Sequence, residues 1–160
     1  MAEQLSSSAR RFQQLLWDRG YVFEVVELPA STRTAKDAAQ AIGCTVPQIA
    51  KSLIFKGHES GSAILAVVSG SNQADTDKLA ALAGEQMDKA DADFVRAKTG
   101  YAIGGVPPTG HREAIRTFID ADLLAFDQIW AAGGTPRSVF GFPPSELVAL
   151  AEGVVADIKQ

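Results

Sequence analysis

The sequence has few residues that could form disulfides or bind metals, and it has no long hydrophobic run. Cys44 is its one cysteine in 160 residues, which excludes an internal disulfide and a metal site made of several cysteines. Its two histidines, His58 and His111, are far apart and belong to no close-spaced ligand motif such as HExxH. No segment predicts a membrane span or a secretory signal. We therefore expect a cytoplasmic protein with no metal and no cofactor.

Positive charge is scarce as well. Fifteen lysines and arginines stand against nineteen acidic residues, which gives a formal net charge of −4. A protein that grips long stretches of phosphate backbone needs a general basic field, and no helix-turn-helix signal is present, so we expect no DNA partner. Any nucleic acid must be held locally, by basic patches that form only in the fold.

Sequence motifs of several enzyme classes are also missing. The sequence has no GK[ST] ending of a Walker A loop, no GxGxxG and no GxSxG, so phosphate-loop, dinucleotide and serine-hydrolase sites have no support. Acidic residues do occur in pairs, but mostly where helices are predicted to begin, and there carboxylates cap exposed N–H groups. These pairs are Asp75/Asp77, Asp91/Asp93 and Asp120/Asp122.

Hydrophobic periodicity and breaker residues predict a single domain over residues 1–160. We expect helices over 6–19, 34–43, 75–83, 91–98 and 143–153. We expect strands over 21–28, 51–55, 63–68, 86–89, 117–120, 126–131 and 138–142. This order is not the regular alternation of a doubly wound parallel sheet. The predicted fold class is α/β of an α+β-like kind, with a mixed β-sheet surrounded by short helices.

Lys51 is out of place in its predicted strand. Strand alternation puts it on the same face as Leu53 and Phe55, which a core-facing side would show. One interpretation is a lysine at the strand end whose ammonium reaches water. The other is a cation at the rim of a pocket, where it holds a phosphate or a carbonyl oxygen.

The loop over residues 100–111, GYAIGGVPPTGH, combines four glycines with two adjacent prolines. Gly104 and Gly105 allow close backbone approaches, and the prolines restrict the backbone after them, so the loop presents main-chain N–H and C=O groups in a fixed array. The alternative is an ordinary tight turn between strands. His111 is interpreted as a polar residue that ends the loop, as a ligand contact or as a general base. Cys44, with no histidine near it in sequence, is predicted to be a small buried side chain rather than a nucleophile.

Five segments together resemble the YbaK/ProX family of aminoacyl-tRNA deacylases. In chain order they are IAKSLIF, AILAVVSG, TGYAIGGVPPTGH, TFIDADLL and AAGGTPRSVFGFPPSEL. The specific part is the combination of Lys51 with a Gly-x-x-x-Pro loop, here Gly104 to Pro108. The resemblance implies a curved mixed sheet and a free-standing domain similar to the editing domain inserted in bacterial prolyl-tRNA synthetases.

The activity that the resemblance implies is trans-editing. Such proteins hydrolyse the ester that joins a wrong amino acid to the 3′ end of a tRNA, commonly tRNA-Pro carrying Ala, Cys, Ser or Thr. The implied partner is the acceptor end of aminoacyl-tRNA, with a synthetase or an elongation factor as a further partner, and with no membrane involved. An aminoacyl ester is already activated, so it needs a positioned water and a stabilised oxyanion more than a protein nucleophile.

Site residues are carried over by position from the resemblance. We predict that Lys51, Gly104 and Gly105 are catalytic: the loop orients the amino acid and a water, and Lys51 contacts the terminal adenosine, its phosphate or the ester oxygen. The predicted substrate contacts are Val106, Pro107, Pro108, His111, Ser69, Tyr21 and Thr45.

Two other interpretations stay open. The first is a non-catalytic module of the same fold that binds a tRNA end or a nucleotide. The second is a regulatory protein that acts through an exposed apolar patch, for which the stretch from Phe140 to Pro144 is the only candidate.

Overall fold

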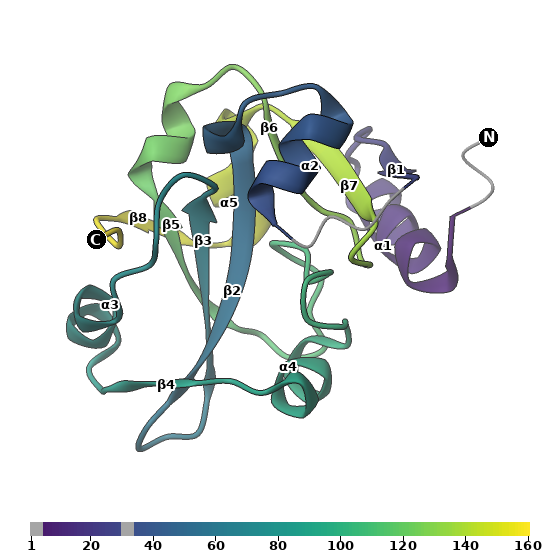
Figure 1. Cartoon of the computed structure of the whole chain (residues 1–160). Helices are drawn as coiled ribbons and strands as arrows, with labels where there is room; N and C mark the ends of the chain where they lie inside the picture. The colour runs from purple at the N-terminus through teal and green to yellow at the C-terminus, as the bar shows by residue number, and fades with distance from the viewer. Residues whose placement is uncertain (1–4, 30–33) are drawn as a thin grey trace.

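One mixed sheet runs through the molecule and short helices pack on both of its faces (Figure 1). The computed structural model describes residues 5–29 and 34–160. The strands, in sheet order, are β1 (Val25–Glu27), β7 (Ser138–Phe142), β6 (Ile129–Ala132), β2 (Ile49–Gly57), β3 (Ala63–Ser69), β5 (Arg116–Asp120) and β8 (Val154–Ala156), and β4 (Met87–Lys89) also pairs with β2. The pairs β2–β6, β3–β5 and β5–β8 are parallel and the others are antiparallel. The sheet is therefore mixed, as the sequence predicts.

The helices are short, and most begin and end at residues that the sequence marks. They are α1 (Ser7–Asp18), α2 (Ala35–Ile42), α3 (Thr76–Ala83), α4 (Ala92–Thr99) and α5 (Leu147–Ala151), with 3-10 turns η2 (Val46–Gln48), η3 (Ala121–Ala125) and η4 (Pro144–Glu146). The side chains of Thr34, Asp75 and Asp91 accept hydrogen bonds from the first-turn N–H groups of α2, α3 and α4. Each of these helices ends at a glycine in the left-handed region. Among the residues described, no helix is long and apolar enough to span a membrane.

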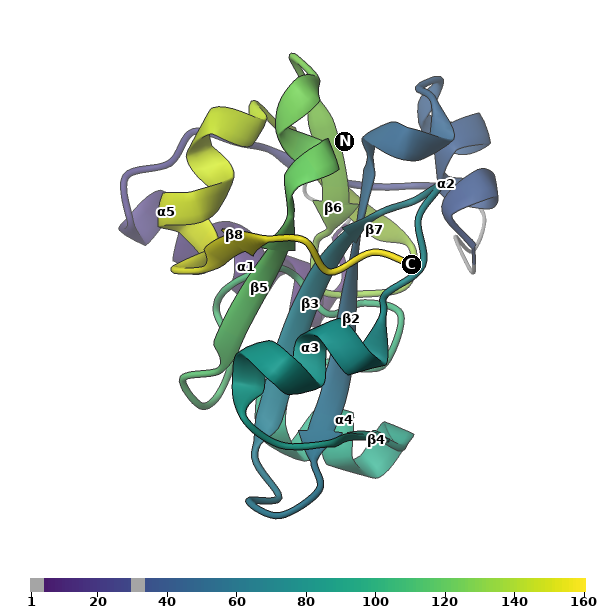
Figure 2. The same ribbon diagram turned by 90° about the vertical axis from the view of Figure 1, so that its left-hand side faces the viewer.

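β3 is the centre of the core because both of its faces are buried. Leu65 and Val67 pack into one cluster with Phe12 of α1 and Phe140 of β7. The alternate residues of β3 pack into a second cluster with Leu79, and Figure 2 shows α3 lying across β2 and β3 on that side. Successive strand residues point to opposite faces, so the continuous apolar run of β3 serves both clusters.

Two strand predictions need correction, and one strand was missed. The strand expected over 21–28 is reduced to β1, because Tyr21 and Phe23 stack on each other, with ring centroids 5.3 Å apart, instead of pairing in the sheet. The strand expected over 126–131 begins only at Ile129, after the turn η3. β8 was not predicted at all; it adds to the edge of β5 after the last helix.

Candidate functional site

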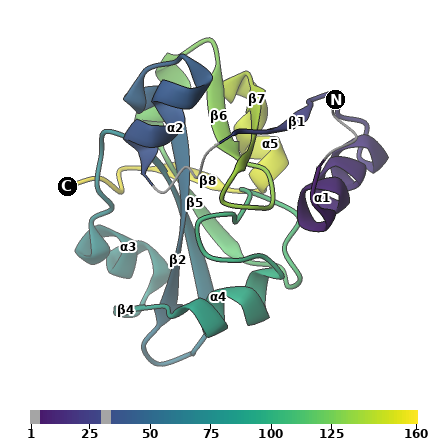
Figure 3. The same ribbon diagram turned by 45° about the vertical axis from the view of Figure 1, so that its right-hand side comes forward.

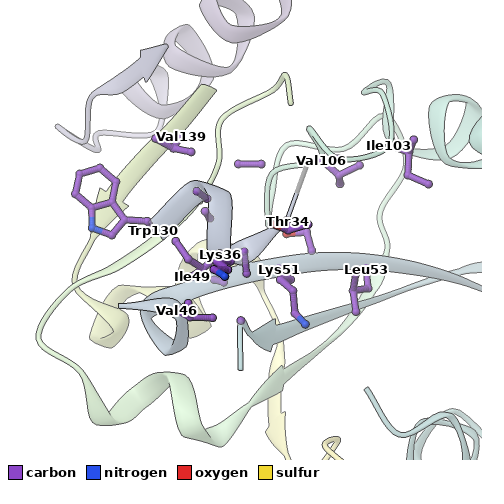
Figure 4. Close-up of a pocket in the computed structure, with 18 residues that line it drawn as sticks. Thr34, Lys36, Val46, Ile49, Lys51, Leu53, Ile103, Val106, Trp130 and Val139 are labelled. Atoms are coloured by element: carbon purple, nitrogen blue, oxygen red, sulfur yellow. The ribbon is translucent and has the colours of Figure 1, made fainter. Parts of the chain in front are cut away.

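A cavity of about 610 Å³ opens beside β2. Its lining comes from α2, η2, β2, the loop after α4, β6 and β7, and Figure 4 shows these side chains. Most of the lining is apolar, including Ile49, Val106 and Trp130, while Lys36 and Lys51 supply two cations. An apolar cavity with a few placed polar groups is the usual form of a small-ligand site.

The cavity forms where one edge of β2 has no strand beside it. On this edge β6 pairs with Ile49 and Ala50, and β4 pairs with residues 55–57. Between these two segments, neither β6 nor β4 pairs with residues 51–54. Figure 3 shows α2 above this gap and the loop after α4 beside it, so β2 offers main-chain and side-chain groups to the space between them.

Lys51 lies at this gap with its ammonium half-buried. Its Nζ donates a hydrogen bond of 2.7 Å to the main-chain oxygen of Asn72. Burial lowers the pKa of Lys51, and the negative charge of Asp120 opposes that shift. β2 and β3 are in register with Lys51 opposite Val68, and Leu53 and Phe55 pack against the same cluster as Val68. The strand alternation therefore predicted the side of the sheet that Lys51 occupies.

The Gly104–Pro108 loop is fixed against the turn between β6 and β7. A Cβ on Gly105 would lie 2.6 Å from the Cα of Thr135, and the Gly105 oxygen accepts a hydrogen bond of 3.1 Å from the Gly134 N–H. Gly104 has a φ of +87°, which an L side chain rarely adopts. Gly104 and Val106 line the cavity on either side of this contact. The loop is thus more than a connection, because it forms one wall of the cavity.

His111 belongs to a different cavity. That cavity, of about 500 Å³, is lined by residues that include Arg19, Thr109 and His111. Nε2 of His111 lies 2.7 Å from the Pro107 oxygen, so this nitrogen carries the proton because a carbonyl only accepts. Burial lowers the pKa of His111. The His111 imidazole therefore stabilises the end of the loop through its hydrogen bond to Pro107.

The remaining predicted contacts do not line the cavity beside β2. Pro107 and Pro108 are buried next to Val106. The hydroxyl of Ser69 donates to the Pro47 oxygen at 2.7 Å, and Thr45 bonds to Gln48. Tyr21 packs with Phe23 against the core. Lys51, Gly104 and Val106 all line the cavity beside β2, and Figure 4 shows the Lys51 side chain pointing away from Val106 and Ile103. Gly105 does not line the cavity.

The sequence did not predict two of the polar residues that line this cavity. Lys36 reaches it from α2, and Ser52 lines it from β2. Ser52 Oγ is the one buried side-chain polar atom, among the residues described, that has no hydrogen-bond partner. Strand alternation could have identified Ser52, since it shares the face of Ala50, whereas the approach of α2 depends on tertiary packing. The described part of the chain has no cluster of three or more His, Cys, Asp or Glu residues suited to a metal ion.

The chain is similar in sequence to a known domain family and to a protein of similar length. The family model described as the aminoacyl-tRNA editing domain matches residues 29–150. The uncharacterised protein YwhH of Bacillus subtilis (strain 168) is 33% identical over 143 residues, which cover 89% of this chain and 88% of that protein.

Two solved structures extend the similarity to three dimensions. The crystal structure of a proposed trans-editing enzyme for prolyl tRNA synthetase is 52% identical, with a TM-score of 0.93 over 98% of this chain and 99% of that one. The crystal structure of hypothetical protein APE2540 is 30% identical, with a TM-score of 0.84 over 92% of this chain and 97% of that one. These matches confirm the predicted mixed α/β fold.

Proposed function

The chain belongs to the family of aminoacyl-tRNA editing domains, and from this premise we propose that it hydrolyses the ester bond of a mischarged tRNA. The proposed substrate is tRNA-Pro carrying a small non-cognate amino acid such as Ala, Cys, Ser or Thr. The observation that carries the proposal is that Lys51 and the Gly104 loop line the same largely apolar cavity. The choice of tRNA-Pro is supported by the relative described as a proposed trans-editing enzyme for prolyl tRNA synthetase.

The lining of the cavity suits both a small amino acid and the phosphates of a tRNA end. Small apolar residues such as Ala50, Ala131 and Ala132 favour a small side chain. Size selection of this kind discriminates by only about 1–3 kcal/mol per methylene, so it rejects a large amino acid more easily than it distinguishes Ala from Ser. Lys36 and Lys51 match the negative charge of the phosphates near the 3′ end of the tRNA.

The reaction in this arrangement is direct attack by water. The water oxygen bonds to the ester carbonyl carbon, the bond from that carbon to the ribose oxygen breaks, and the ribose oxygen leaves with a proton. Main-chain groups of the loop from Gly104 to Val106 orient the amino acid and the water, while the Lys51 ammonium contacts the ester oxygen or the neighbouring phosphate. No protein nucleophile is required, because the ester is already activated.

A deacylation panel tests the proposal. The wild-type protein and Lys51→Ala are incubated with tRNA-Pro charged with Ala, Cys, Ser, Thr or Pro, and the remaining ester is measured over time. We expect rapid loss of at least one mischarged species, and we expect Lys51→Ala to slow it by about 100-fold or more, as is typical for a group that stabilises transition-state charge.

The matched control is Lys56→Ala, which removes a lysine from the same strand that lies over the Phe94 ring and does not line the cavity. It should deacylate as the wild type does. No hydrolysis of any species, with tight tRNA binding retained, would contradict the proposal and favour the non-catalytic binding module.

A further inference from the structure

Hydrogen bonds through Asn72 connect the Lys51 ammonium to the carboxylate of Asp120. Lys51 Nζ donates to the main-chain oxygen of Asn72 at 2.7 Å. The side-chain Nδ2 of Asn72 donates to Asp120 Oδ2 at 2.8 Å. Asp120 is only 2% exposed, and a buried carboxylate is costly unless it is well paired. Asn72 therefore links a buried carboxylate to the ammonium at the site.

The topology of the sheet places Asp120 at the turn that follows β3. β3 and β5 are parallel neighbours, so their carboxyl ends, Ser69 and Asp120, lie at the same edge. Asp120 Oδ2 also accepts a hydrogen bond of 3.0 Å from the Ser69 N–H. The Asn72 N–H bonds to the Ser69 oxygen at 2.9 Å. One carboxylate therefore holds both ends of the turn from Ser69 to Asn72.

The same turn is packed tightly against residues 46–49, which form the 3-10 turn η2 and the first residue of β2. A Cβ on Gly70 would clash with the Val46 oxygen, and the Gly70 N–H donates to the Ile49 oxygen at 2.7 Å. The Ser69 hydroxyl donates to the Pro47 oxygen at 2.7 Å. Because the turn is held on both sides, the Asn72 oxygen has a fixed place relative to β2 and Lys51.

We infer that Asp120 and Asn72 are positioning residues for Lys51, with Asp120 fixing the turn that offers the Asn72 oxygen to the lysine ammonium. The inference rests on the proposed function, in which Lys51 contacts the substrate. A lysine side chain is long and flexible, so a fixed acceptor reduces the number of positions that its ammonium can take. Neither Asp120 nor Asn72 lines the cavity, and both act through Lys51.

Asp120 also affects the charge of Lys51. Its carboxylate opposes the effect of burial on the pKa of Lys51. The other charged groups nearby are Lys36, which shares the cavity, and Asp122, which bonds to Asn72 and to Lys159. Replacing Asp120 by asparagine removes the favourable charge, so the pKa of Lys51 falls further. Any reaction that needs the charged ammonium then loses rate at a lower pH than in the wild type.

The experiment measures Lys51 directly as well as activity. The side-chain NMR signal of Lys51, assigned with Lys51→Arg, is titrated in the wild type, Asp120→Asn and Asn72→Ala, and deacylation is followed across the same pH range. For Asp120→Asn we expect a lower titration midpoint, a lower alkaline limit of activity and a fall of about 10- to 100-fold in kcat, as misplacement of a reacting group commonly causes. Asn72→Ala should also lower kcat, with a smaller change in the midpoint.

Asp88→Asn is the matched control, because it changes the net charge equally but removes a surface partner of His58. It should leave both readouts at their wild-type values. Failure of the wild type to deacylate any species would contradict the proposed function. A lower titration midpoint of Lys51 in Asp120→Asn would support the inference even in that case. An unmoved Lys51 signal in folded Asp120→Asn overturns the inference even where deacylation is established. Should Asp120→Asn fail to fold, unchanged Lys51 signals and unchanged kcat in Asn72→Ala overturn it equally.

Discussion

The two histidines of the chain have opposite electrostatic surroundings. His111 is half-buried; burial lowers its pKa, the hydrogen bond with Pro107 opposes that shift, and Arg19 adds to it. His58 is exposed and its ring bonds to the Asp88 carboxylate at 2.9 Å, which raises its pKa. The folded state therefore disfavours protonation of His111 and favours protonation of His58, so the two contribute pH dependences of opposite sign.

We predict that His111 makes the protein less stable in mild acid. Its folded pKa lies below the unfolded value of about 6.5, so below that value the unfolded state binds more protons and stability falls, by at most about 1.4 kcal/mol per pH unit. Urea unfolding at pH 7.5 and 5.5 measures the effect, and His111→Gln should reduce the difference between the two. His58→Gln should enlarge the difference, because the raised pKa of His58 stabilises the fold at low pH. A larger difference in His111→Gln would contradict this account.

Ser52 and Ser69 differ in whether their hydroxyls have partners. Ser52 Oγ is buried without one, whereas Ser69 Oγ donates to the Pro47 oxygen. A buried polar group without a partner costs about 1–3 kcal/mol, and a typical made hydrogen bond contributes about 1 kcal/mol. We predict that Ser52→Ala leaves the free energy of unfolding unchanged or raises it, while Ser69→Ala lowers it by about 1–2 kcal/mol. Denaturant unfolding of both variants checks this, and a marked loss of stability in Ser52→Ala would show that its hydroxyl has a partner.

At the scale of elements, the loop over 100–111 depends on two glycines for different reasons. Gly105 packs against the backbone of Thr135, whereas a Cβ on Gly104 would meet nothing closer than Pro136 at 3.8 Å. Gly104→Ala therefore costs only the strain of a positive φ, about 1–2 kcal/mol. Gly105→Ala must push the loop away from the β6–β7 turn, a change that typically costs about 1–3 kcal/mol and displaces one wall of the cavity.

We predict that Gly105→Ala reduces deacylation by about 100-fold, because displacement of a site by about 1 Å has effects of this size. Gly104→Ala should reduce deacylation less than Gly105→Ala does, when the two variants are equally stable. Kinetics and unfolding measured on both variants separate loss of position from loss of fold. Equal activity in the two folded variants would show that contact with Thr135 does not position the loop.

The same elements show what could be predicted from the sequence. Helices with a capping side chain and a terminal glycine, such as α3 between Asp75 and Gly84, carry local signals, and they were predicted closely. β8 has only three residues, two of them exposed, and it exists because the edge of β5 is available. Lys51 was predicted as a site residue partly because it breaks the alternation of a strand, and it does line the cavity. Asp120 was interpreted as a helix cap, and it does accept the Asp122 N–H, but its bonds to Ser69 and Asn72 come from the parallel pairing of β3 and β5.

At the scale of the whole molecule, the net charge limits how tRNA is held. With a net charge of −4, the protein has no general field that attracts phosphate over a distance. The cavity beside β2 provides two ammonium groups, those of Lys36 and Lys51. Each contact with a phosphate of single-stranded nucleic acid adds about −0.7 to the slope of log affinity against log salt. Two such contacts give a slope of about −1.4, far shallower than for proteins that grip long duplexes.

We predict a slope of about −1.4 for log(1/KM) against log salt in deacylation assays between low and physiological salt. Lys36→Ala should reduce its magnitude by about 0.7, while Lys56→Ala, on the same strand as Lys51 but outside the cavity, should leave it unchanged. A slope of about −5 or steeper would require roughly seven phosphate contacts, more than the cavity can supply. The tRNA would then also contact a second surface of the protein. Arg11 and Arg112, whose side chains both lie near Gly100, would be the first residues to replace in a search for that surface. A shallow slope instead means that this acidic domain recognises the acceptor end alone.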